Sequence, residues 1–261
     1  MPIIKSGNGY IYKNRAKRTK HKKWLFVFFL FVCSACAIFG SFFAFSLVDV
    51  TSALSLNKYL VFEEKIYFAV SVESSDSHFE ASKNASTLKL QDGAGYVLKK
   101  NEKFFLIVGV YSTRDDAQKV LEKLNSNNAS IVEICLEKLI ISSSYNSQQI
   151  EALKSALSLV DDAYSSLSEI VISLDRAEIL DAEARQKLKL FEETCRLRKE
   201  SFSKAFQNDY QNLITRVKIF LSETISNIST LSISQNLSSD IKYQTVSILS
   251  SFLSLEQNVK K

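Results

Sequence analysis

The sequence predicts an α+β protein with three parts: a single N-terminal transmembrane helix, a small domain of mixed strands and helices, and an all-α helical bundle. Three observations support this. Residues 24–48 carry no charged side chain. Residues 65–142 alternate helical patterns with short stretches rich in β-branched and aromatic residues. Residues 110–261 contain neither glycine nor proline, which favours long helices in the C-terminal part.

The uncharged segment at 24–48 is long enough to cross a bilayer, because a helix rises about 1.5 Å per residue and the hydrocarbon core is about 30 Å thick. It follows a basic arm, residues 1–23, which contains lysines and arginines but no acidic residue. Lysine and arginine are retained on the cytoplasmic side of a membrane. We therefore expect a single-pass cell-membrane protein with a cytoplasmic N-terminus and extracytoplasmic domains after Asp49.

A cleaved signal peptide is the alternative for this segment. The apolar region of a signal peptide is about 7–15 residues long, which is much shorter than the stretch found here. Residues 34–36 (Ser-Ala-Cys) faintly resemble a lipoprotein cleavage box, but Cys33 stands where that box usually has leucine. The sequence therefore favours an uncleaved anchor.

The net charge of +5 originates in the basic arm. Without the eight basic residues of the arm, 25 of the 33 lysines and arginines remain against 28 aspartates and glutamates, so the extracytoplasmic part is slightly acidic. A nucleic-acid-binding domain has a concentrated basic surface, and the sequence beyond the arm does not predict one. We expect no nucleic-acid partner and interpret the arm as a topology signal that also attracts anionic lipid.

Residues suited to catalysis or metal binding are few. The two histidines lie on opposite sides of the predicted membrane, and no zinc-binding motif is present. Cys33 and Cys36 have C-x-x-C spacing but lie within the lipid segment, where we expect them to be packing residues. Cys135 and Cys195 could form a disulfide, and the sequence leaves this open. The sequence predicts neither an enzyme nor a bound cofactor or metal.

The small domain, predicted for residues 65–142, follows a connector at residues 49–64. Glycines and polar clusters mark its turns. Thr113 is a good helix N-cap, with two aspartates in the first turn after it, where carboxylates suit the helix dipole. In order, the expected elements are a strand at 65–72, a weak helix at 79–88, a strand at 96–98, a strand at 103–111, a helix at 113–124 and a strand at 129–142.

This β-α-β-β-α-β order is the split βαβ, ferredoxin-like arrangement. An internal repeat supports it, because residues 68–75 (FAVSVESS) align with residues 106–113 (LIVGVYST), and each copy is a strand that enters a helix. Two such units would bury one face of a sheet under two helices. The other face would be left open.

The second copy resembles the SPOR domain, a small bacterial module that binds peptidoglycan. The resemblance is carried by residues 104–124, FFLIVGVYSTRDDAQKVLEKL, with a Val-Gly pair at 108–109, then an aromatic residue, a serine, a helix start and an alanine. It extends over residues 65–140. The first copy departs from the family pattern, since the family's Gln and Gly would fall at Ala69 and Ser71.

The resemblance implies binding to peptidoglycan glycan strands, at division septa or during sporulation, on the open face of the sheet. By alternation along the strands, the glycan-binding candidates on that face are Tyr67, Ala69, Ser71, Phe105, Ile107 and Glu133. Cys135 would lie on the same face. A face this apolar is usually covered in soluble domains, so burial by protein is the second interpretation. The solvent accessibility of Phe105 and Ile107 distinguishes the two.

The C-terminal region, residues 148–261, is predicted to form a helical bundle. Apolar residues recur every three or four positions in four segments, at 150–174, 181–206, 209–228 and 241–255, which is typical of amphipathic helices packed in an antiparallel bundle. Such a bundle serves as a spacer, a self-association module or a surface for protein partners. The combined hypothesis is a membrane-anchored, non-catalytic protein that binds the cell wall; the alternative is an extracytoplasmic scaffold that no longer binds glycan.

Overall fold

The computed structural model describes residues 4–6, 9–11 and 58–259, except for Asn125, Ser144, Asn208 and Tyr210. The chain divides into two compact units, Met1–Asn57 and Lys58–Lys261. In the first unit, β1 (Ile4–Ser6) pairs with β2 (Gly9–Ile11) in antiparallel fashion. The predicted membrane segment, residues 24–48, lies outside the described residues. Within the described ranges, no helix has the length and apolar character needed to span a bilayer.

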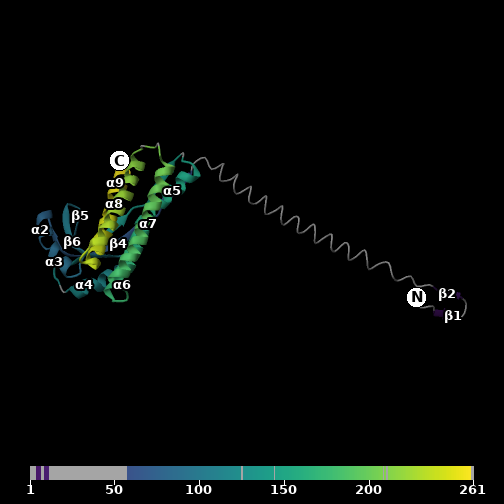
Figure 1. Ribbon diagram of the computed structural model, residues 1–261, viewed down its shortest axis with the longest axis horizontal. Helices are drawn as coiled ribbons and strands as arrows, with labels where there is room; N and C mark the ends of the chain where they lie inside the picture. Colours follow the sequence, from purple (N-terminus) through teal and green to yellow (C-terminus); the bar gives the residue numbers. More distant parts are fainter. Residues whose placement is uncertain are drawn as a thin grey trace. The chain divides into compact units, whose positions relative to one another are not determined.

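The second unit is an α+β assembly, with the strands first and the long helices after them, as predicted (Figure 1). Its first part comprises β3 (Lys58–Phe62), β4 (Lys65–Ser75), α2 (His78–Lys83), α3 (Ala85–Leu90), β5 (Tyr96–Lys100), β6 (Lys103–Tyr111), α4 (Arg114–Leu124), β7 (Ser130–Leu136) and β8 (Leu139–Ser143). Its second part comprises α5 (Ser147–Leu157), α6 (Leu159–Asp175), α7 (Asp181–Ala205), α8 (Asn212–Thr230), η1 (Leu231–Ile233) and α9 (Leu237–Val259).

The four-stranded sheet has the order β5-β6-β4-β7 with every neighbouring pair antiparallel. This is the spatial order of the predicted split βαβ arrangement. The β5–β6 hairpin closes through Asn101 and Glu102, which both have positive φ values, of 49° and 61°. Two consecutive residues with positive φ are the signature of the tight hairpin turn whose twist matches that of the flanking strands.

The strand predicted at 129–142 is in fact two strands. Leu136 and Leu139 are both buried, although residues three apart in one continuous strand would point to opposite faces. The chain therefore turns between β7 and β8. β8 then pairs antiparallel with β3, with Leu60 opposite Ile141. The segment predicted as a connector, 49–64, thus contains a strand, which is a correction to the domain boundaries expected from sequence.

The C-terminal helices agree with the predicted segments, with one break that periodicity does not indicate. The helix expected at 150–174 is divided at Ser158 into α5 and α6. Asn146 caps α5 through a reciprocal pair of hydrogen bonds with Gln149, whose backbone N–H donates to Asn146 Oδ1 over 2.9 Å. Such a capping box satisfies two backbone N–H groups that a helix start leaves without partners. The long helices α6, α7, α8 and α9 pack side by side (Figure 1).

A continuous hydrophobic core joins one face of the sheet to the long helices. Helices α2 and α4 pack on one side of the sheet, whereas α9 contacts β5, β6 and β7. Buried residues from the strands, such as Tyr67 and Ile107, belong to the same cluster as Leu167 of α6, Phe202 of α7 and Val246 of α9. The predicted small domain and the predicted bundle are therefore one compact body.

Candidate functional site

The sheet face predicted to bind glycan is covered by the chain's own helices. Tyr67, Ala69, Ser71 and Ile107 are at most 5% exposed. Phe105 is half-buried and packs against the same core. The expectation of an open face is therefore wrong for these residues. The physical reason is that helix α9, far along the chain, places its apolar surface on the sheet.

Glu133 and Cys135 lie on the opposite face of the sheet from the one predicted. In the register of β4 with β7, Glu133 stands opposite Phe68, while Ile134 stands opposite Tyr67. Residues directly opposite each other share a face, so Ile134 and its alternate neighbours join the covered face. Glu133 instead forms an ion pair with Arg114 of α4, at 3.3 Å between Oε1 and Nη1.

Asp161 of α6 is the polar centre of the covered face. Its carboxylate accepts a hydrogen bond from Tyr67 Oη at 2.9 Å and pairs with Lys65 Nζ at 2.5 Å. The Tyr67 ring packs on Tyr164 with 4.6 Å between ring centroids. Burial raises the pKa of the Tyr67 hydroxyl well above its usual range, and the negative charge of Asp161 raises it further. Tyr67 is thus held neutral as a hydrogen-bond donor, and its hydrogen bond to Asp161 links β4 of the sheet to α6.

Replacing Tyr67 by Phe is expected to lower the free energy of unfolding by about 1 kcal/mol near neutral pH, because one hydrogen bond is lost. The difference between wild type and variant should narrow as the pH rises above about 10, since Tyr67 ionises in the unfolded chain before it does in the folded one. Urea unfolding near neutral pH and at about pH 11 measures both effects, because the second pH lies above the pKa of an unfolded tyrosine. A difference that stays constant with pH would contradict the assignment.

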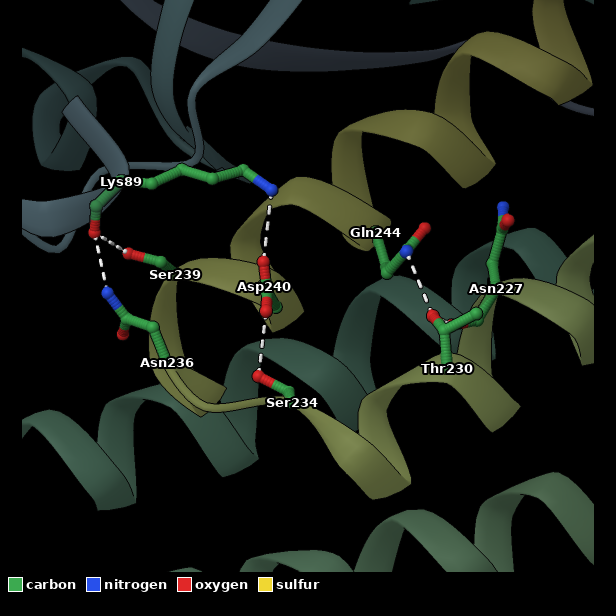
Figure 2. A network of polar contacts seen from close by, with 8 residues as sticks. All are labelled: Lys89, Asn227, Thr230, Ser234, Asn236, Ser239, Asp240 and Gln244. Atoms are coloured by element: carbon green, nitrogen blue, oxygen red, sulfur yellow. Dashed lines mark hydrogen bonds and ion pairs between the residues drawn. The ribbon is translucent and has the colours of Figure 1, made fainter. Parts of the chain in front are cut away.

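A second polar joint ties the end of α3 to the beginning of α9 (Figure 2). Lys89 Nζ contacts Asp240 Oδ1 at 3.0 Å, and the Lys89 carbonyl accepts hydrogen bonds from Asn236 Nδ2 at 2.7 Å and Ser239 Oγ at 2.6 Å. Ser234 Oγ donates to the second oxygen of Asp240 at 2.7 Å. The carbonyl of Lys89 at the end of α3 is therefore paired with side chains at and just before the start of α9, which ties α3 to that helix.

Cys135 and Cys195 are free thiols, so the disulfide left open by the sequence is not formed. Cys195 is fully buried in α7, and burial raises the pKa of its thiol to about 12. A thiol reacts through its thiolate, so a raised pKa and burial both slow its modification.

We expect iodoacetamide to modify half-buried Cys135 in the folded chain at mildly alkaline pH, and Cys195 only after unfolding. Peptide-resolved mass spectrometry reports each thiol separately. Equal rates at the two residues before denaturation would show that the α7 core opens readily, contrary to this expectation.

Sequence reasoning missed Asp161 and Lys89. Asp161 lies within the helix predicted at 150–174, and only contacts distant in sequence, with Lys65 and Tyr67, place it against the sheet. Among the described residues, no group of three or more His, Cys, Asp or Glu side chains is arranged to hold a metal ion.

Comparisons with family models, with curated proteins and with solved structures find no match to this chain. The similarity to the SPOR domain therefore rests on the residues quoted above.

Proposed function

We propose that this protein is a membrane-anchored, non-catalytic extracytoplasmic scaffold whose SPOR-like sheet no longer binds glycan through its predicted face. One observation carries the proposal: Tyr67, Ala69, Ser71 and Ile107 are buried beneath helices of the same chain. Access of a sugar strand to these residues would require α6 and α9 to leave the sheet, against the packing of the shared core and the hydrogen bonds at Asp161.

The anchor in this proposal is the uncharged segment at residues 24–48, preceded by its basic arm. Its topology is tested by expressing the full chain in bacteria and adding protease to spheroplasts. We expect the external protease to cut the chain and release a fragment that contains residues 58–261. Protection of this region from external protease until the membrane is broken would place it in the cytoplasm and overturn the orientation.

A sedimentation assay distinguishes the scaffold hypothesis from the cell-wall-binding hypothesis. The purified full chain in detergent is mixed with insoluble peptidoglycan, either untreated or stripped of stem peptides by an amidase. We expect the chain to stay in the supernatant in both cases, at a salt concentration that screens the basic arm. Sedimentation that prefers the stripped wall would favour the cell-wall-binding hypothesis over the scaffold.

A further inference from the structure

The outer edge of β7 faces a groove. β7 is the last strand of the four-stranded sheet, so one side of it has no neighbouring strand in that sheet. Two adjoining hollows, of 450 and 560 Å³, lie between this strand and the β5–β6 hairpin, and both are lined by Lys100, Asn101 and Glu133. Binding sites for drug-sized ligands have volumes of about 300–1,000 Å³. The groove is therefore large enough to hold a short segment of chain.

Two side chains mark which backbone groups of β7 point into this groove. Lys100 Nζ, from the end of β5, donates a hydrogen bond to the carbonyl oxygen of Glu133. The backbone N–H of Glu137, one residue past β7, donates to Glu256 Oε2 of α9 at 3.3 Å. In an antiparallel ladder, alternate residues direct their backbone groups toward the partner strand and away from it. Glu133 and Glu137 are four residues apart and therefore point the same way, which is away from β4.

The same alternation places the backbone N–H and C=O of Ile131 and Cys135 on this outer edge. An edge strand with outward backbone groups is a template for another strand, and proteins often blunt such edges with lysine side chains. Lys100 has this role here, because it crosses the groove to reach the backbone of β7. The hollows also contain the apolar side chains of Phe105, Ile134 and Leu253, which would contact alternate side chains of an added strand.

We propose that the β7 edge binds an extended peptide segment of a partner protein by strand addition, with apolar side chains at alternate positions of the peptide directed into the groove. Strand addition uses main-chain hydrogen bonds for affinity and side-chain contacts for specificity. The peptide displaces the Lys100 ammonium from the Glu133 carbonyl and pairs with Ile131, Glu133 and Cys135. This inference deepens the proposed scaffold function, because it gives the chemistry of the partner.

The probe is a displayed library of seven-residue segments, selected on the full chain in detergent. Besides the unmodified peptide, an enriched peptide is synthesised in two N-methylated forms, one methylated at the odd-numbered residues and one at the even-numbered residues, because only alternate residues pair with β7. We expect the N-methylated form that lacks the pairing donors to lose binding in fluorescence anisotropy. Hydrogen exchange should slow at the amides of Ile131 and Cys135 when the unmodified peptide is bound.

Variants of the chain provide the matched controls. Cys135→Pro removes one outward N–H, and proline is tolerated on edge strands, so the peptide should bind about fivefold to tenfold more weakly. Cys135→Ala controls for loss of the thiol and should bind as wild type does. Lys100→Ala should bind more tightly, whereas Lys123→Ala, on α4 and outside both hollows, should not change affinity. The far-UV circular dichroism of each variant verifies the fold.

Three results would overturn the proposal: no enriched peptide, equal affinity of the two N-methylated forms, or exchange protection confined to other elements. If Cys135→Pro does not fold, the comparison of the two N-methylated forms still decides. Self-association of the peptide-free chain through the β7 edge would assign that edge to a second copy of this chain. This result would also overturn the proposal. Wall sedimentation is measured separately, so failure of the scaffold proposal and failure of strand addition are distinguishable.

Discussion

Replacing Ile107 by Ala is expected to lower the free energy of unfolding by about 2–5 kcal/mol, the range for buried large-to-small substitutions. Ile107 is 0% exposed, and its cross-strand neighbours in the sheet are Ser71 and Tyr96. The Tyr96 ring in turn packs on Tyr243 of α9, with 5.0 Å between centroids. A cavity at Ile107 therefore weakens the contact between sheet and helix. Urea unfolding of the full chain in detergent, followed by circular dichroism, measures the change.

The matched control for Ile107 is Ile140→Ala on β8. Ile140 is 57% exposed, so its loss should change stability by no more than about 0.5 kcal/mol. The contrast between two isoleucines on strands tests the covered face directly. If both substitutions had the same small effect, Ile107 would be solvent-accessible in solution, and the cell-wall-binding hypothesis would regain its surface.

Replacing Phe202 by Ala is expected to cost about 3–5 kcal/mol, because a fully buried aromatic ring leaves a large cavity. Phe202 is 0% exposed in the middle of the core, with its ring centroid 4.7 Å from that of Phe206. The substitution lies in α7, within the region that the sequence assigns to a separate bundle. Because the core is continuous with the sheet, we expect the substitution to destabilise both the sheet and the long helices.

Hydrogen exchange shows which elements the Phe202→Ala substitution destabilises. Amides of β4 that exchange by global unfolding should lose protection in Phe202→Ala by the same factor as amides of α8. Leu197→Ala, on the same helix but 58% exposed, should leave both unchanged. Unaltered protection of β4 in the Phe202 variant would mean that the sheet and the bundle unfold independently, as two domains.

The order of the elements could be predicted from local patterns. Stretches rich in β-branched and aromatic residues gave the strands at 65–72 and 103–111, and glycines and polar clusters gave the turns. Spacing by three or four gave the long helices, and the N-cap chemistry of Thr113 gave the start of α4 to within one residue. These signals depend on neighbours within a turn or a strand, so they are present in the sequence itself.

The site could be predicted less well, because its geometry depends on pairings between distant residues. Alternation assigned Tyr67 and Ala69 to the same face as Ile107, but it could not tell that Glu133 faces the other way, since this depends on the register of β7 against β4. Nor could it tell that Lys58–Phe62 pairs with β8.

The sequence by itself therefore determined most of the elements, their order and the apolar character of both sheet faces. The tertiary structure alone decided what covers the sheet face opposite α2 and α4. An apolar surface requires burial, but the hydrophobic effect is not directional and does not specify the partner. Here the helices far along the chain supply it, through the apolar side of α9 and the hydrogen bond between Asp161 and Tyr67.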